Sequence, residues 1–268
     1  MRSAASRLVI VVVLGANLPA SADTAPSWPE RPSLLQGALD LPARLRPIRV
    51  FLDAGHGAED NTGNRSAYCA AEQDFTLSLA GELQSMLEAA GFQTRLSRDA
   101  HAPVPYAERA NAAAAWNADV LISLHSDIRG HAQAWSPSAA VTCLRSREAP
   151  GFSVLFSDAG NDRAAGARER AATAIGSAMR TAGFLAYDGA HYGSDYAATE
   201  APGVFVDRHP PGKRIYMLYA PRVPSILIET HNALDDREVR LWNSSATRRA
   251  FASALARALG DLDLEPND

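Results

Sequence analysis

The sequence predicts a three-layer α/β domain, in which helices flank a mostly parallel, twisted sheet of about six strands. Two observations carry this prediction. Short apolar runs of strand length alternate along the chain with longer stretches that have helical periodicity. Residues 119–127 (DVLISLHSD) are apolar almost without interruption, as expected of a strand that is covered on both faces. Strands that alternate with helices in this way form a parallel sheet between helical layers.

The first elements follow in regular order. Residues 48–55 are predicted as the opening strand. In residues 74–90 apolar side chains recur at three- and four-residue steps and a glycine follows, which predicts a helix. Residues 92–98 alternate as a strand does. Residues 105–116 begin with a proline and are rich in alanine, which favours a second helix before the strand described above.

The second half is less regular. Residues 152–158, 214–220 and 223–231 are predicted as strands, and residues 162–182 as an alanine-rich helix. Residues 234–260 are predicted as one final helix, because apolar side chains recur there at four-residue steps behind a capping pattern.

The first 22 residues have the pattern of a signal peptide. A positively charged start precedes an apolar run over residues 8–14, and the segment ends in Ala20-Ser21-Ala22. The run is shorter than the roughly 20 apolar residues that cross a bilayer. We therefore expect export to the periplasm or secretion, with no stable membrane insertion after the signal is removed. The proline-rich residues 23–46 are predicted as a linker or arm, residues 47–262 as the folded domain, and residues 263–268 as a tail.

Composition and charge narrow the range of partners. The chain is 47% hydrophobic and 21% charged, which is typical of a folded globular protein. Its formal net charge is −4 and no block of lysine and arginine stands out, which argues against a nucleic acid partner. Export would place Cys69 and Cys143 in an oxidising compartment, where a disulfide is favoured; two unlinked thiols are the alternative.

Residues 184–213 change in character. They are rich in Gly, Tyr, Asp and Pro and show no clean period. A loop of this length inside a compact domain is usually functional or mobile. The segment is interpreted as an insert: a lid, a regulatory element or a wall that contacts the substrate.

Four polar residues lie at the end of a predicted strand or at the start of a helix. In open α/β sheets, functional sites collect outside the carboxyl ends of the strands. Two histidines with one carboxylate are a common Zn²⁺ ligand set, and a further glutamate can act as general base and then acid. Each residue also has a purely structural interpretation, such as a turn residue or a buried polar group with a local partner. The four residues are His56, Glu72, His125 and Glu229.

A second carboxylate competes for the metal. His56 and Glu59 form an H-x-x-E string, which has the ligand spacing of zinc carboxypeptidases. Such short strings recur by chance, and the surrounding chain lacks the remainder of a carboxypeptidase pattern.

The chain from about residue 48 to residue 262 resembles the zinc-dependent N-acetylmuramoyl-L-alanine amidases of the type 3 class, which cleave peptidoglycan. Four blocks carry the resemblance, and their order and spacing agree with the family. They are VFLDAGHG (50–57), EQDFTLSLAGELQSMLEAAGFQTRLSRD (72–99), ERANAAAAWNADVLISLHSD (108–127) and VPSILIETHNALDDRE (223–238).

The resemblance implies a role for each matched residue. His56, Glu72 and His125 would bind Zn²⁺, and Glu229 would activate the water. Glu72 is favoured over Glu59, because Glu72 heads the amphipathic helix as the family ligand does. The implied reaction is hydrolysis of the amide between N-acetylmuramic acid and the L-Ala of the stem peptide, in cell-wall remodelling or cell separation.

The sequence departs from the family pattern in three places. Thr230-His231-Asn232 follow the catalytic position, so His231 could support a ligand, contact the reacting group or lie on the surface. Ser126-Asp127 replace the usual residues after His125. The segment 184–213 is longer than the minimal pattern and contains two further histidines. In some relatives an inserted helix blocks the zinc until an activator protein docks, so an activator is a candidate partner. The two further histidines of segment 184–213 are His191 and His209.

Two other functions remain open on sequence grounds. One is a zinc peptidase of carboxypeptidase type that uses His56, Glu59 and His125. The other is a non-catalytic peptidoglycan-binding module that has kept the fold. A non-catalytic binding module has no need of a general base at position 229.

Overall fold

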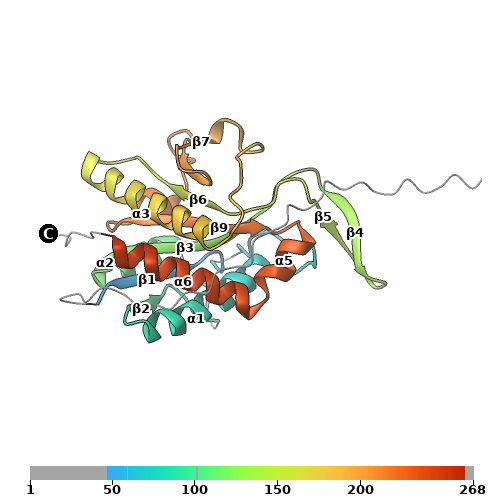
Figure 1. Cartoon of the computed structure of the whole chain (residues 1–268), viewed down its shortest axis with the longest axis horizontal. Helices are drawn as coiled ribbons and strands as arrows, with labels where there is room; N and C mark the ends of the chain where they lie inside the picture. The colour runs from blue at the N-terminus through green and yellow to red at the C-terminus, as the bar shows by residue number, and fades with distance from the viewer. Residues whose placement is uncertain (1–46, 59, 101, 263–268) are drawn as a thin grey trace, which may run out of the picture. The chain divides into compact units, whose positions relative to one another are not determined.

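The computed structural model describes residues 47–58, 60–100 and 102–262 (Figure 1). The predicted signal peptide, linker and tail lie outside the described residues, as does Glu59. Among the helices described, none has the length and apolar character that crossing a membrane requires.

A seven-stranded sheet forms the centre of the domain, in the order β2-β1-β3-β9-β6-β8-β7. Four of its strand pairs are parallel (β1–β2, β1–β3, β3–β9 and β6–β8), while β6–β9 and β7–β8 are antiparallel. The predicted mostly parallel sheet is confirmed, with one strand more than expected. The strands are β1 (Arg49–Ala54), β2 (Gln93–Leu96), β3 (Val120–Asp127), β6 (Ser153–Phe156), β7 (Tyr196–Ala198), β8 (Val204–Asp207) and β9 (Ser225–Asn232).

Three long helices cover one face of the sheet: α1 (Glu72–Ala89), α3 (Asp162–Thr181) and α6 (Ser245–Asp261). Helices α3 and α6 pack side by side (Figure 1). On the opposite face lie α2 (Tyr106–Ala115) and the single turn α4 (Tyr216–Tyr219), and the short helix α5 (Asp236–Trp242) follows β9. The domain therefore has the predicted three layers.

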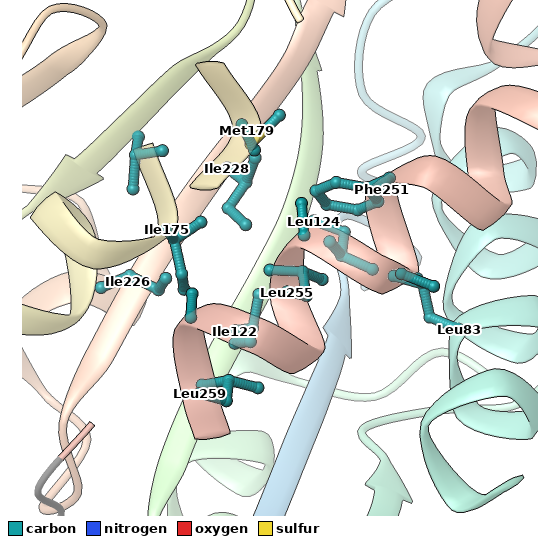
Figure 2. Close-up of a cluster of buried hydrophobic side chains, with 14 of the residues drawn as sticks. Leu83, Ile122, Leu124, Ile175, Met179, Ile226, Ile228, Phe251, Leu255 and Leu259 are labelled. Atoms are coloured by element: carbon teal, nitrogen blue, oxygen red, sulfur yellow. The ribbon is translucent and has the colours of Figure 1, made fainter. Parts of the chain in front are cut away.

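The main core lies between the sheet and the three long helices (Figure 2). Every second side chain of β3 and β9 points into this core, and the side chains between them point to the opposite face of the sheet. Ile226 and Ile228 of β9 face this core, whereas Leu227 packs into the smaller cluster on the other face. The side chains drawn in Figure 2 include Leu83, Ile122, Leu124, Ile175, Met179, Phe251, Leu255 and Leu259.

Two elements were predicted wrongly. Residues 214–220 were expected as a strand, but they contain α4, a single helical turn in which the Ala220 amide donates to the Tyr216 carbonyl at 3.0 Å. The single final helix is two helices, α5 and α6. The break falls at Ser244, whose hydroxyl accepts from the Thr247 amide at 3.2 Å and so caps α6.

A hairpin of β4 (Gln133–Ser138) and β5 (Val141–Arg145) has no counterpart in the prediction. It projects from the domain beyond the end of β3 (Figure 1). Disulfide Cys69–Cys143 joins it to the loop that precedes α1. The indole of Trp135 adds a hydrogen bond of 2.8 Å to the Ala67 carbonyl. The candidate cysteine pair is therefore bonded in the structure.

Residues 184–213 form part of the main sheet. Strand β8 is fully buried and pairs with β6, and β7 pairs with β8 at the edge. Aromatic side chains on this segment, among them Tyr187, Tyr192 and Phe205, pack against one another. The segment that looked like a loop thus completes one side of the sheet.

Candidate active site

The structure brings together three of the four predicted polar side chains as neighbouring donor atoms. His56 follows β1, Glu72 is the first residue of α1 and His125 lies on β3. His56 Nε2 lies 2.9 Å from Glu72 Oε2, and His125 Nδ1 lies 3.0 Å from Glu72 Oε1. The two ring nitrogens are 3.1 Å apart. Parallel strands that end at one edge of the sheet produce this convergence.

Glu72 is fixed by backbone donors as well as by the histidines. The Ser126 amide donates to Oε1 at 2.9 Å and the Asn64 amide donates to Oε2 at 3.0 Å. Burial opposes ionisation of this carboxyl, yet the hydrogen bonds from His125 and His56 hold its pKa well below the usual range. Glu72 is therefore a carboxylate, which is the form that binds a metal.

The side-chain amide of Asn61 orients the His56 ring through the ring nitrogen that points away from Glu72. Asn61 Oδ1 lies 2.8 Å from His56 Nδ1 and also accepts from the Gly63 amide at 3.1 Å. Because the amide oxygen can only accept, Nδ1 carries a proton, and Nε2 is the ring nitrogen that faces Glu72 and His125. Asn61 Nδ2 donates in turn to the Tyr106 hydroxyl at 2.8 Å.

Asn61→Ala should weaken metal binding by about 10- to 100-fold, the range expected when the hydrogen-bonding partner of a ligating histidine is lost. The measurement is a chelator competition assay on the purified protein. Asn111→Ala, on the exposed side of α2, is the matched control and should bind metal normally. An unchanged metal affinity in Asn61→Ala would show that Asn61 does not orient His56.

Two glycines give the ligands room. A Cβ on Gly55 would overlap the His125 ring. Gly63 has φ +74°, and a Cβ there would lie 2.5 Å from Glu72 Oε2. These positions admit no side chain because the ligand side chains already occupy the space.

Two buried arginines hold the turn that carries His56. Arg98 donates to the carbonyls of Ala54 and Gly55, at 2.8 and 3.1 Å. Arg109 donates to the carbonyls of Ala54 and His56, at 3.0 and 2.6 Å, and pairs with Asp53 at 3.0 Å. His56 itself has φ +60°, a left-handed conformation that a non-glycine residue adopts at a cost. The arginines stabilise that conformation.

Arg109→Met should lower the free energy of unfolding by roughly 3–5 kcal/mol, because it leaves Asp53 charged and without its ion-pair partner in the interior. Both side chains of this pair are fully buried. The check is chemical denaturation against Arg95→Met, which changes an exposed arginine of β2. Equal stability of the two variants would contradict the proposed importance of the pair.

Glu229 lies directly beside His125. The two residues are register partners in the parallel pair β3–β9, so their side chains leave the same face of the sheet. Glu229 Oε2 is buried, and the structure gives it no hydrogen-bond partner among the described residues. Burial, and then the negative charges of Asp127 and Glu72, raise the pKa of Glu229 well above its usual value. A buried carboxyl with an unused oxygen is costly to maintain, which indicates a chemical role.

All four residues line one cavity of about 550 Å³. One wall is polar and is made by the ligand residues and their supports. The other wall is mostly apolar and comes from α4, the end of β3 and β9. Its residues are Ile128, Ile215, Tyr216, Met217 and Leu227.

The remaining predicted histidines are elsewhere. His231 is buried and stacks on Trp242, with its ring centroid 5.9 Å away, and its Nδ1 lies 2.9 Å from Thr230 Oγ1. The same Thr230 hydroxyl donates to the His125 carbonyl at 2.9 Å, so it connects His231 to the strand that carries His125. His209 pairs with Asp207 at 2.8 Å, and neither His209 nor His191 lines the cavity.

The donor set fits a metal ion. Two imidazole nitrogens and one carboxylate oxygen, all within 4.8 Å of one another, point to a common centre. Nitrogen and oxygen donors in this number leave a position open for a further ligand, as catalytic metal sites require. The residues could thus hold a divalent cation beside Glu229.

Comparison with known proteins agrees with this geometry. The chain is 26% identical over 217 residues to the N-acetylmuramoyl-L-alanine amidase AmiA of Escherichia coli (strain K12), covering 78% of this chain and 74% of that relative. It is 29% identical over 234 residues to the N-acetylmuramoyl-L-alanine amidase AmiC of Neisseria meningitidis serogroup B, covering 79% of this chain and 51% of that relative.

The solved structure of the N-acetylmuramyl-L-alanine amidase Ami1 from Mycobacterium smegmatis has the same fold. Its TM-score is 0.62 at 21% identity, over 81% of this chain and 97% of that chain. The family profile described as N-acetylmuramoyl-L-alanine amidase matches residues 50–261, most of the sequence. The chain therefore belongs to the N-acetylmuramoyl-L-alanine amidase family.

Proposed function

We propose that this protein is an exported Zn²⁺-dependent hydrolase that cleaves the amide between N-acetylmuramic acid and the L-Ala of peptidoglycan stem peptides. The observation that carries the proposal is that His56, Glu72 and His125 converge in one cavity that Glu229 also lines, with its Oε2 buried and given no hydrogen-bond partner among the described residues. Family membership supplies the substrate and the bond. Such an activity serves cell-wall remodelling or cell separation.

His56, Glu72 and His125 would hold the ion through Nε2, a carboxylate oxygen and Nδ1. When bound, Zn²⁺ acidifies a water molecule and polarises the scissile carbonyl. Glu229 would accept the proton of the water as the C–O bond forms, and then give that proton to the amide nitrogen, so that the C–N bond breaks and the amine leaves. The raised pKa makes Glu229 a stronger base than an ordinary carboxylate, which suits a group that takes a proton and gives it back.

The immediate surroundings of Glu229 support this role. Its register partner His125 places the carboxyl next to the metal ligands, and Ser153 faces it from the antiparallel strand β6. Apolar residues line part of the cavity, and electrostatic interactions are stronger in less polar surroundings.

The two competing functions have less support. A carboxypeptidase-type site would need Glu59 as a ligand, whereas Glu72 already accepts from both histidines through its two oxygens. A non-catalytic binding module would have no use for a carboxyl beside the donors with one oxygen buried and without a hydrogen-bond partner, and among the described residues Glu229 is such a group.

We infer that the site works without the removal of a blocking helix by an activator. No residue of 184–213 lines the cavity, and the His56 and His125 side chains remain 19% and 13% exposed in the described part of the chain. Strand β8 of this segment is buried in the sheet, so its deletion would unfold the domain rather than open the site. The partner we propose is peptidoglycan alone.

The test is incubation of the zinc-loaded mature protein with purified peptidoglycan, followed by product analysis. We expect release of free stem peptides with L-Ala at the amino terminus, with no added protein. Cuts between stem residues would replace the proposal with a peptidase. Cleavage only after addition of a cell extract would contradict the inference that no activator is needed.

A further inference from the structure

Apolar side chains gather at the mouth of the cavity. Only five large hydrophobic side chains are exposed in the described residues, and three of them stand together here. Ile128 and Tyr216 line the cavity, and the ring of Tyr219 lies 5.7 Å from that of Tyr216, centroid to centroid. Exposed apolar groups that cluster beside a functional cavity mark a binding surface rather than scattered surface residues.

The fold presents the two tyrosines on a fixed support. Both belong to α4, whose other residues, Met217 and Leu218, are buried in separate clusters on the sheet. The Ile215 amide, just before the turn, donates to the buried carboxylate of Asp207 at 3.0 Å. Tyr216 and Tyr219 are 39% and 41% exposed. The planes of the two rings are inclined at 68°, an edge-to-face arrangement.

The substrate that the proposed function assigns has two arms, and its scissile amide joins them. One arm is a peptide that carries carboxylates, and the other is a glycan whose lactyl carboxyl is masked in the amide. Among the described residues, no lysine or arginine lines the cavity, so the lining offers no cationic side chain to the carboxylates of the peptide arm. The cavity mouth offers aromatic faces instead. Such faces suit the apolar C–H side of a neutral sugar ring.

We propose that Tyr216 and Tyr219 form a glycan-binding surface, on which the saccharide arm of peptidoglycan lies while the amide enters the cavity. This inference rests on the proposed function for the identity of the substrate. It adds that the enzyme distinguishes substrates by the length of the sugar chain attached to the cleaved residue. Tyr219, which lies beyond the cavity lining, would contact a sugar next to the N-acetylmuramic acid.

The test measures binding apart from catalysis. A neutral tetrasaccharide of N-acetylglucosamine, which lacks the free lactyl carboxylates of peptide-free N-acetylmuramic acid, is titrated into the mature protein and followed by NMR. We expect saturable binding that Tyr219→Ala weakens by about three- to tenfold, the range for the loss of one aromatic contact. Tyr219→Phe keeps the ring and should bind as the wild type does. Leu144→Ala, which removes an exposed apolar side chain on the β4–β5 hairpin, is the matched control.

A second measurement uses the protein as an enzyme. The ratio of kcat/KM for a tetrasaccharide-linked peptide to that for an N-acetylmuramoyl peptide should fall in Tyr219→Ala by a similar factor. Absence of tetrasaccharide binding to the wild type, or equal binding by Tyr219→Ala, would overturn the glycan surface. Loss of binding to a free stem peptide instead would assign the tyrosines to the peptide arm and also overturn it. Glycan binding without any hydrolysis would refute the proposed function and leave the glycan surface supported.

Discussion

Glu229→Gln should reduce kcat on peptidoglycan by roughly 10²- to 10⁴-fold, the contribution of a general base and acid, while the protein keeps its metal. The glutamine has almost the same shape but can neither take the proton of the water nor return one to the leaving amine. Because Glu229 is not among the three converging donors, the metal content should stay near one ion per chain. Turnover and metal content are measured on the same preparation.

The matched control for this variant is Glu169→Gln, which changes an exposed glutamate of α3 and should leave turnover unaltered. Loss of the metal in Glu229→Gln would make Glu229 a ligand instead of a base. Full activity in Glu229→Gln would show that Glu229 takes no part in the reaction and that another group in the cavity accepts the proton.

Glu72→Gln should abolish both stoichiometric metal binding and activity. Among the described residues, Glu72 is the only carboxylate in the donor cluster, and its two oxygens face the two histidines at 2.9 and 3.0 Å. The loss should exceed the roughly 10- to 100-fold expected for a residue that only supports a ligand. Metal is measured by elemental analysis after dialysis, and re-addition of excess Zn²⁺ should restore little activity.

Glu59→Gln supplies the contrast, because Glu59 has the spacing of a carboxypeptidase ligand to His56. It should keep metal and turnover. Metal loss in Glu59→Gln with retention in Glu72→Gln would reverse the ligand assignment and restore the peptidase hypothesis.

The elements that could be predicted from sequence are those with one clear pattern and one buried face. Helix α1 and strands β1, β3 and β9 fall within a few residues of the predicted ranges, since their apolar spacing directly reflects burial. The β4–β5 hairpin gave no such signal, because most of its side chains on both faces are exposed. Strand β7 has three residues and sits at the sheet edge among turn-forming residues, too short to show a period.

The site was partly predictable for a similar reason. His56, Glu72, His125 and Glu229 could be selected because strand ends and helix starts are visible in sequence. Asn61 and Arg109 could not, because their partners are a ring nitrogen and backbone carbonyls brought close only by folding. Polar residues in a loop or on an alanine-rich helix look the same whether they face solvent or a carbonyl. The resemblance to the amidase family, by contrast, rested on the ordered blocks themselves.

The pairing of β3 with β9 fixes the distance between His125 and Glu229. His125 and Glu229 are opposite each other in the parallel register, so their separation is set by the spacing between hydrogen-bonded strands rather than by flexible side chains. A slip of β9 by a single residue would turn Glu229 towards the side of Ile226 and Ile228, into the apolar core beneath α3 and α6. Formation of the cavity and correct folding of the central sheet are therefore one event: a chain that misaligns these two strands moves Glu229 away from the metal-binding donors and disrupts the core as well.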